Sequence, residues 1–385
     1  MTGDIEVIVC AGGAGWELPL LRGLQRPDLG IRVVRRCVDH GELLGTALRD
    51  RPRAVVLDAA LGWLDRDLVA TLKGAGVDVV AVGAPRGRDG LGAVRVDADV
   101  DADGLARALD ALGPAAVPFD AIPADGGTGR LVVVWGGTGA PGRTTVAVHL
   151  AIESAHRGES TLLVDGDGWA ASVAQLLELD ESPSIAQAAR LAAQGWPTPL
   201  DDCLQPGPEG LAVLAGLPRS ELWPEVRPVA WRSVLAAATS TFGTVIVDVA
   251  APIEEDEALV ADRIPFRRNL MTTTALDRAD VVLLVTSGDP IGLRRGVIAH
   301  RQLAERAVPG TPEPSVVLNR TPRNGRHAQD CSRAVESWVG APPLALLPVE
   351  PTFSRVVWEG RPMQEVAPRS PWLRELRDLS ERVAS

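Results

Sequence analysis

The sequence predicts an α/β protein of two domains, each built around a parallel sheet. Short apolar runs alternate with helical segments from residue 5 onward, and a stretch rich in Pro and Gly interrupts them at 113–129. A glycine-rich turn then joins a strand directly to a helix. A chain of 385 residues is long enough for two domains. We therefore expect one domain over 1–112, a linker over 113–129 and a larger domain over 130–385.

The first domain is predicted to be a doubly wound parallel sheet. Its apolar runs are typical of buried strands, and the segments between them have the periodicity of helices. The expected strands are 5–10, 31–34, 54–58, 77–82 and 93–96, and the expected helices are 17–24, 41–50, 64–74 and 102–112.

A βα domain of this size resembles the receiver of response regulators. Asp58 ends the third strand, where a receiver has its phosphoacceptor. The resemblance implies an acidic pair after the first strand, a hydroxyl after the fourth and a Lys after the fifth. Cys10-Ala-Gly-Gly13 and Gly83-Ala84 stand at the first two places, and no Lys follows Val96. Because the metal ligands are missing, we expect a degenerate receiver that makes contacts and is not phosphorylated.

A glycine-rich turn joins the strand expected at 130–135 to a helix expected at 144–156. Its spacing fits the phosphate-loop pattern GxxxxGK[ST], except that Arg143 stands at the Lys position. Backbone N–H groups and the helix N-terminus of such a loop attract phosphate, and the hydroxyl of Thr144 is placed to bind magnesium. The sequence thus predicts a site for ATP and Mg²⁺. Its loop residues are Gly137, Thr138, Gly139, Ala140, Pro141, Gly142, Arg143, Thr144 and Thr145.

Further strands are expected after the loop, at 161–164, 244–247, 281–285, 315–318 and 344–347. Candidate functional residues stand directly after four of them. These residues are Asp165 and Asp167, then Asp248, then Asn319 and Arg320, and finally Pro348. This order predicts the parallel sheet of a P-loop NTPase with helices on both faces.

Residues from about 130 to 385 resemble the MinD/ParA family of deviant Walker-A ATPases. With the receiver-like domain in front, the chain is similar to the TadZ/CpaE branch, which helps to place type IV (Flp/Tad) pilus machinery. The resemblance implies that Asp165 and Asp167 belong to switch I, with Asp167 positioning the attacking water. It also implies that Asp248 is the Walker-B carboxylate, which holds magnesium through water. Alternatively, Asp165 and Asp167 cap a turn.

The same resemblance assigns the base-binding residues. Asn319 and Arg320 would touch adenine, and Pro348 would pack beside the base. The alternative for Asn319 is a turn-forming residue.

Two lysines are usual in the loop of this family, and this chain has neither. Thr138 occupies the signature position and Arg143 the ordinary one. Arg spreads its charge over a planar fork, so the replacement is not conservative, and one well-placed cation is worth about 10³–10⁵ in phosphoryl transfer. We expect ATP binding with slow or absent hydrolysis, the catalytic residues being Asp167, Arg143 and Asp165. Arg267 and Arg268 either supply charge to the phosphates or form a solvated pair.

The function expected from the resemblance is a dimerising spatial regulator of pilus assembly, polar localisation or septum-site type. Its partners would be a second copy when ATP is bound and a protein at the cell pole or pilus machinery. One alternative is a pseudo-ATPase scaffold, and another is a ParA-like chromosome or plasmid partitioning ATPase. The net charge of -11 disfavours nucleic-acid binding.

The sequence predicts a cytoplasmic protein, because it shows neither a long uncharged apolar run nor a secretory signal. The helix expected at 371–383 carries an apolar face, but its three Arg are balanced by three acidic residues. Interfacial helices are rich in basic residues, so this helix is expected to pack on its own domain. Peripheral association with the membrane is the alternative. The four cysteines are widely spaced, which favours buried free thiols.

Overall fold

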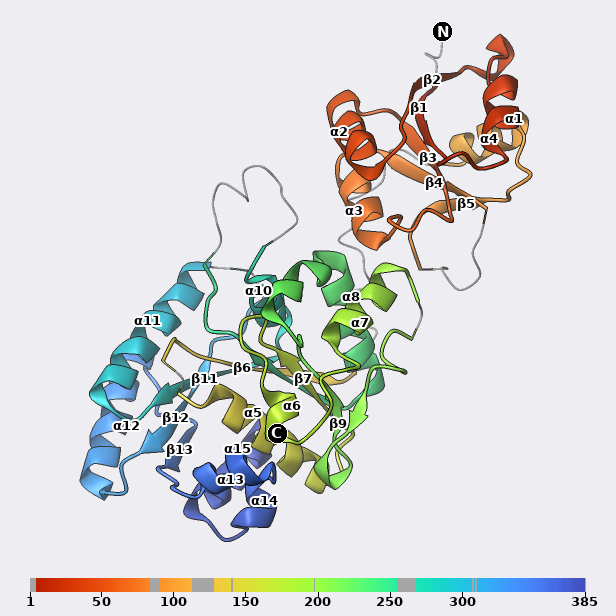
Figure 1. Ribbon diagram of the computed structural model, residues 1–385. Coiled ribbons are helices and arrows are strands. Elements are labelled where there is room, and N and C mark those ends of the chain that lie inside the picture. Colours follow the sequence, from red (N-terminus) through yellow and green to blue (C-terminus); the bar gives the residue numbers. More distant parts are fainter. Residues whose placement is uncertain are drawn as a thin grey trace. The chain divides into compact units, whose positions relative to one another are not determined.

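The computed structural model describes residues 5–83, 90–112, 128–139, 141–196, 198–254, 267–306, 308 and 310–384. The chain divides into two compact units (Figure 1), which are Met1–Ala124 with Leu191–Thr198, and Asp125–Arg190 with Pro199–Ser385. The linker expected at 113–129 lies outside the described residues up to residue 127.

The first unit is a parallel sheet with the strand order β2-β1-β3-β4-β5. One apolar cluster packs α2 and α3 on one face, and a second packs α1 and α4 on the other. The predicted doubly wound sheet is therefore confirmed. The strands are β1 (Ile5–Cys10), β2 (Ile31–Arg36), β3 (Ala54–Asp58), β4 (Asp78–Val82) and β5 (Val94–Val96). The helices are α1 (Glu17–Gly23), α2 (His40–Asp50), α3 (Arg66–Gly74) and α4 (Ala102–Asp110).

Asp58 ends β3, and both of its carboxylate oxygens are engaged. Trp16 Nε1 donates to Oδ2 at 2.7 Å, and the backbone N–H of Ala60 donates to Oδ1, also at 2.7 Å. At the end of β1, Cys10 and Ala11 are buried apolar residues. The Asp58 carboxylate is thus hydrogen-bonded to an indole, whereas in a working receiver it binds a metal ion. Of the pair Gly83-Ala84, Ala84 lies outside the described residues.

Incubation of the full chain with acetyl phosphate and Mg²⁺ is expected to leave its intact mass unchanged. The reason is that no acidic pair directly follows β1 to hold the Mg²⁺ ion that would neutralise the phosphoryl group on Asp58. A working receiver treated in parallel serves as the control. A phosphoryl adduct that disappears in Asp58→Asn would contradict this expectation.

The second unit is a larger sheet with the order β13-β12-β11-β6-β10-β7-β9-β8, in which the β8–β9 pair is antiparallel and the other pairs are parallel. Strand order reverses beside β6, which lies between β10 and β11, and ligands of such sheets bind at this point. The strands are β6 (Arg130–Trp135), β7 (Thr161–Gly166), β8 (Gln205–Pro206), β9 (Ala212–Leu214), β10 (Thr244–Val249), β11 (Val281–Ser287), β12 (Ser315–Thr321) and β13 (Ala345–Pro348).

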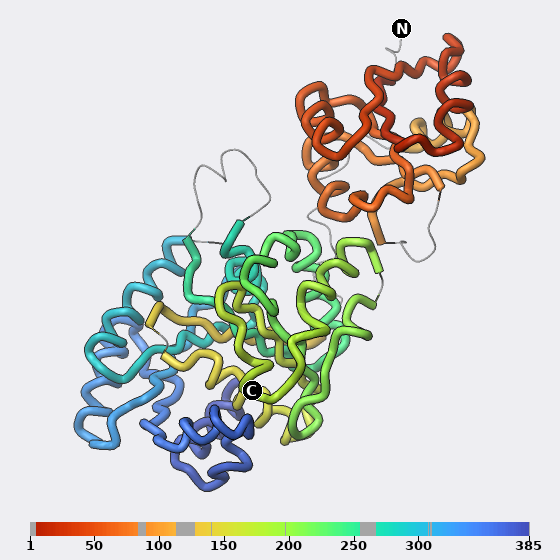
Figure 2. The backbone as a smooth tube through the Cα atoms, viewed as in Figure 1, coloured from red at the N-terminus to blue at the C-terminus, as the bar shows by residue number. Residues whose placement is uncertain are grey.

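Helices cover both faces of this second sheet, as predicted (Figures 1 and 2). Helices α5 and α15 pack on one face, and α8, α10, α11 and α12 contact the strands from the other. The helices are α5 (Arg143–His156), α6 (Val173–Leu176), α7 (Ile185–Ala193), α8 (Pro228–Thr241), α10 (Leu270–Arg278), α11 (Pro290–Arg306), α12 (Gly325–Val339), α13 (Phe353–Glu359), α14 (Met363–Val366) and α15 (Pro371–Ala384).

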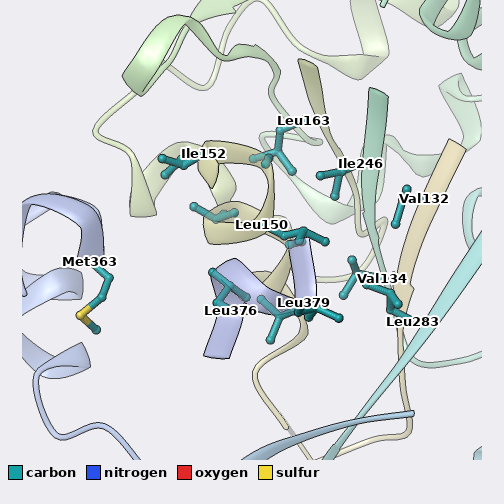
Figure 3. Packing of buried hydrophobic residues seen from close by; sticks show 14 of the residues in the cluster. Val132, Val134, Leu150, Ile152, Leu163, Ile246, Leu283, Met363, Leu376 and Leu379 are labelled. Atoms are coloured by element: carbon teal, nitrogen blue, oxygen red, sulfur yellow. The ribbon is translucent and has the colours of Figure 1, made fainter. Parts of the chain in front are cut away.

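The main core lies between this sheet and the pair α5 and α15. Leu150 and Ile152 of α5 meet alternate strand residues such as Ile246, while Leu376 and Leu379 of α15 complete the layer (Figure 3). The last helix therefore packs on its own domain, as expected. All four cysteines are buried free thiols, and no helix among the described residues is both long and apolar enough to cross a bilayer.

Candidate nucleotide-binding site

The turn between β6 and α5 has a backbone that requires glycine. Gly139 and Gly142 have φ values of +103° and +95°, which side chains rarely adopt. A Cβ on Gly142 would lie 2.4 Å from Asn319 Nδ2, and one on Gly136 would lie 2.2 Å from the carbonyl oxygen of Val285. The loop backbone thus packs closely against Asn319 and Val285, and the loop ends at the N-terminus of α5. Ala140 lies outside the described residues.

A cavity of about 450 Å³ opens beside this helix N-terminus. The end of the loop, the segment after β7 and part of the β12 end line it. The lining residues include Gly142, Arg143, Thr144, Thr145, Asp167, Ser172 and Arg320. The backbone N–H groups of a first helical turn have no intrahelical partners, so this cavity favours an anion. We call it the phosphate cavity.

Asp165 and Asp248 lie opposite each other in the β7–β10 register, and both are buried. Asp165 is occupied: one oxygen accepts from the N–H groups of Ser172 at 2.9 Å and Val173 at 3.0 Å, and the other from Asp167 at 3.2 Å. Asp165 thereby caps the start of α6. This geometry fits the capping alternative and leaves Asp165 little freedom to act on a substrate.

Asp248 differs from Asp165, because neither of its buried carboxylate oxygens has a hydrogen-bond partner among the described residues. Burial and the neighbouring Asp165 raise the pKa of Asp248 well above its usual value, and Thr144 and Arg143 act in the opposite direction. Burial also raises the pKa of Asp165 to about 6. An unpaired buried carboxylate is costly, and a divalent cation would offset that cost.

The donors around Asp248 fit magnesium. Among the described residues, no group of three or more His, Cys, Asp or Glu side chains could enclose a metal ion. Mg²⁺ usually keeps several waters and takes one or two protein ligands together with phosphate oxygens. Thr144 at the start of α5 and Asp248 at the end of β10 are such a pair of ligands, the carboxylate acting through water.

Asp167 lines the phosphate cavity and caps the turn that follows β7. Its Oδ1 accepts from the N–H groups of Trp169 at 2.8 Å and Ala170 at 2.9 Å. The Arg268 guanidinium lies 4.1 Å from the centre of the Trp169 ring, and Trp169 Nε1 donates to Asn269 Oδ1 at 3.0 Å. This stacking ties the Asp167 turn to the segment before α10.

Of the three arginines singled out in the sequence as cations for the phosphates, Arg143 alone lines the phosphate cavity. Arg143 Nη1 donates to the loop carbonyl oxygens of Gly136 at 3.3 Å and Gly137 at 3.0 Å. Neither Arg267 nor Arg268 lines the phosphate cavity. Arg143 is thus the one cationic side chain of the loop, and part of its guanidinium is hydrogen-bonded to the loop's own carbonyl oxygens.

A second cavity of about 450 Å³ shares Thr145 and Arg320 with the phosphate cavity. We call it the base cavity. Its remaining walls come from α5 and α6, from the ends of β12 and β13, and from α13 and α15. The walls include Asn319, Pro348, Phe353, Trp358 and Trp372. All three predicted base-binding residues therefore line one space.

Asn319 is buried and already engaged on both sides of its amide. Nδ2 donates to the carbonyl oxygen of Pro141 at 2.8 Å, and Oδ1 accepts from Trp372 Nε1 at 3.0 Å. Asn319 thus joins the phosphate loop to α15. The predicted contact with adenine would therefore be made by the second Nδ2 proton of Asn319 or by the neighbouring Arg320. The backbone of Arg320 has a φ of +53°.

Sequence reasoning missed two contributors to the base cavity. Trp358 lines it and is 89% exposed. His149 on α5 is buried; its Nε2 accepts from the Met363 N–H at 3.0 Å, so Nδ1 donates to the Thr145 carbonyl oxygen at 2.8 Å. Burial lowers the pKa of His149 to about 4, which keeps it neutral. Neither residue stands in a motif, so only the fold identifies it.

Comparisons with known proteins agree with this geometry, although no family model matches the chain. A ParA family ATPase from Chlorobium tepidum superposes with a TM-score of 0.56 at 18% identity, covering 66% of this chain and 98% of that one. The septum site-determining protein MinD of Pyrococcus horikoshii, solved with Mg-ADP, gives 0.52 at 22% identity, covering 66% and 95%. The carboxy-terminal unit has the fold of the MinD and ParA ATPases.

One curated relative is also similar. It is an uncharacterized ATP-binding protein of Methanocaldococcus jannaschii, which is 21% identical over 252 residues, or 66% of this chain and 86% of the relative. At these identities the structural likeness establishes the fold, and the chemistry of this chain rests on its own residues.

Asp248→Asn is expected to stabilise the unliganded chain at pH 8. Burial raises the pKa of Asp248 and of Asp165, that of Asp165 to about 6. The folded state therefore binds more protons than the unfolded state above about pH 4, the ordinary pKa of Asp, and stability falls as the pH rises through the raised pKa values. Asp248→Asn removes one of the two adjacent carboxylate charges, and it should raise the melting temperature by about 2–4 °C for each kcal/mol gained in the free energy of unfolding. Differential scanning fluorimetry at pH 5 and pH 8 measures the effect, which should be smaller at pH 5. A lower melting temperature at pH 8 would contradict it.

Proposed function

We propose that this chain binds Mg-ATP at the phosphate loop and acts as a nucleotide-dependent spatial regulator. The observation that supports this proposal most is the buried carboxylate of Asp248. No donor among the described residues makes a hydrogen bond of good geometry to its oxygens, and the side chain that most favours its ionised form is Thr144 at the N-terminus of α5. A bound magnesium ion and triphosphate would satisfy both the carboxylate and the unpaired N–H groups. The relatives described as ATP-binding and as bound to Mg-ADP support this choice of ligand.

In this proposal the loop backbone, the two magnesium-binding residues and Asp167 have different roles. Backbone N–H groups of the loop and of the first α5 turn hold the phosphates, and Thr144 and Asp248 hold magnesium, which neutralises phosphate charge. Asp167 at the rim of the phosphate cavity would orient a water for attack. Turnover would be slow, because Thr138 brings no cation and Arg143 braces the loop carbonyl oxygens.

We further infer that ATP binding promotes dimerisation and that the first unit docks the dimer at its cellular site. The TadZ/CpaE-like order of a degenerate receiver before the ATPase fold supports a role in pilus assembly or polar localisation. The occupied Asp58 supports a receiver used for contacts. Mass measurement by light scattering with and without Mg-ATP tests dimerisation, and a mass that stays the same would overturn that part.

Calorimetric titration of the full chain tests the binding site. The unaltered chain should bind ATP in the presence of Mg²⁺, and Thr144→Ala should weaken binding roughly 10- to 100-fold, because a hydroxyl contact to a charged group is lost. Thr241→Ala, which removes an exposed hydroxyl on α8, serves as the control. Absence of heat at millimolar Mg-ATP would reject the proposal and favour a pseudo-ATPase scaffold.

Trp358→Ala is expected to weaken Mg-ATP binding by about 1–3 kcal/mol, the usual contribution of base stacking on an aromatic ring. Trp358 presents its ring at the base cavity and makes few contacts within the fold, so the melting temperature should hardly change. Trp196→Ala removes an exposed ring that lines neither cavity and is the matched control. Equal affinities for both variants would exclude Trp358 from base binding.

A further inference from the structure

Helix α11 follows β11, the neighbour of β6 on the side away from β10. Two glycines bring its first turns unusually close to that strand. A Cβ on Gly292 would lie 2.4 Å from the carbonyl oxygen of Ser287, and one on Gly296 would lie 3.0 Å from Thr286 Oγ1. Thr286 Oγ1 also donates to the Gly292 carbonyl oxygen at 2.6 Å. The beginning of α11 is thereby fixed to the end of β11.

This close packing places α11 directly against the phosphate loop. A Cβ on Gly137 would lie 3.2 Å from the carbonyl oxygen of Arg295 and 3.6 Å from Ala299 Cβ. A Cβ on Gly139 would lie 1.9 Å from Arg295 Nη1 and 2.7 Å from its Cζ. The Arg295 guanidinium therefore lies against the backbone of Gly139, in the space that a side chain at residue 139 would take.

Arg295 is exposed, and its guanidinium has no hydrogen bond or ion pair within the described part of the chain. The nearby carboxylate of Asp289 accepts hydrogen bonds from Ser287 Oγ and from the N–H groups of Ile291 and Gly292, which lower its pKa, and Arg295 interacts with it only through its charge. A guanidinium carries five N–H donors that suit phosphate oxygens. Arg295 thus presents unused donors at the loop.

The two cavities give the direction in which a nucleotide would lie. Thr145 lines both, so the phosphate nearest the sugar would lie at the α5 end of the loop. The terminal phosphate would then lie toward the residues where the loop begins, Gly137 to Gly139. This is the side on which Thr138 brings no charge and on which Arg295 lies.

We propose that Arg295 supplies the cation that the loop lacks, by contacting the terminal phosphate of a bound nucleoside triphosphate at Gly139. The proposal rests on the proposed function and adds to it the residue that distinguishes ATP from ADP. ADP has no phosphate at this position, so the contact is made to ATP alone. Arg295 thereby makes the site selective for the triphosphate state.

Calorimetric titrations of Mg-ATP and Mg-ADP into the full chain test this role. Arg295→Gln removes the charge while keeping a polar stem, and should weaken ATP roughly 10- to 100-fold while leaving ADP within about 2-fold. Arg295→Lys should retain most of the preference for ATP. Arg294→Gln is the matched control, because Arg294 is the preceding exposed arginine on α11 and does not approach the loop glycines.

The outcomes separate this proposal from the proposed function. Failure of the unaltered chain to bind ATP would reject the nucleotide site itself. If ATP binds but Arg295→Gln keeps the ratio of ATP to ADP affinity, or if Arg295→Lys loses it to the same extent as Arg295→Gln, the assignment of Arg295 is overturned. Circular dichroism and melting temperatures of all variants exclude loss of fold as the cause.

Discussion

The carboxylate of Asp248 is the constraint on which the site depends. It ends β10 in the middle of the larger sheet, next to Asp165 of β7, and both are buried. Asp165 accepts hydrogen bonds from three backbone N–H groups, whereas the oxygens of Asp248 accept none from the described residues. Two buried carboxylates side by side are unfavourable unless one binds a proton or a cation. The fold accepts this cost at the place where a helix N-terminus and Thr144 meet a cavity, which is the arrangement a magnesium-bound polyphosphate stabilises.

Three contacts from distant parts of the chain hold the loop around that constraint. Arg143 donates to the carbonyl oxygens of the first loop residues. Asn319 links Pro141 of the loop to Trp372 of α15, and Arg295 of α11 lies against Gly139. The last helix is therefore part of the site as well as part of the core. Positive charge that other phosphate loops place on lysines within the loop is distributed here between Arg143 and a helix beside the loop.

The sequence was enough to predict most of the sheet, because buried parallel strands are near-continuous apolar runs with polar residues at their ends. Of the strand-end residues that it singled out, Asp167, Asn319, Arg320 and Pro348 line the two cavities, whereas Asp165 and Asp248 line neither. The short strands β8 and β9 were not predicted, because a run of two or three residues is too short to show the alternation of apolar and polar residues that marks a strand. The engagement of Asn319 depends on a tryptophan 53 residues further along the chain, and the position of Arg295 depends on how closely α11 packs. The spacing Gly292-x-x-x-Gly296, four residues apart on one helix face, was the available signal for that close packing.

A crystal structure of the full chain with Mg²⁺ and a non-hydrolysable ATP analogue would show whether the loop and Asp248 form a magnesium-nucleotide site. We expect phosphates on the loop from Gly137 to Thr144, a magnesium ion between Thr144 and a water held by Asp248, and the base in the cavity that Trp358 lines. An empty loop at saturating analogue, with Asp248 still unpartnered, or a nucleotide bound elsewhere on the chain, would contradict these expectations.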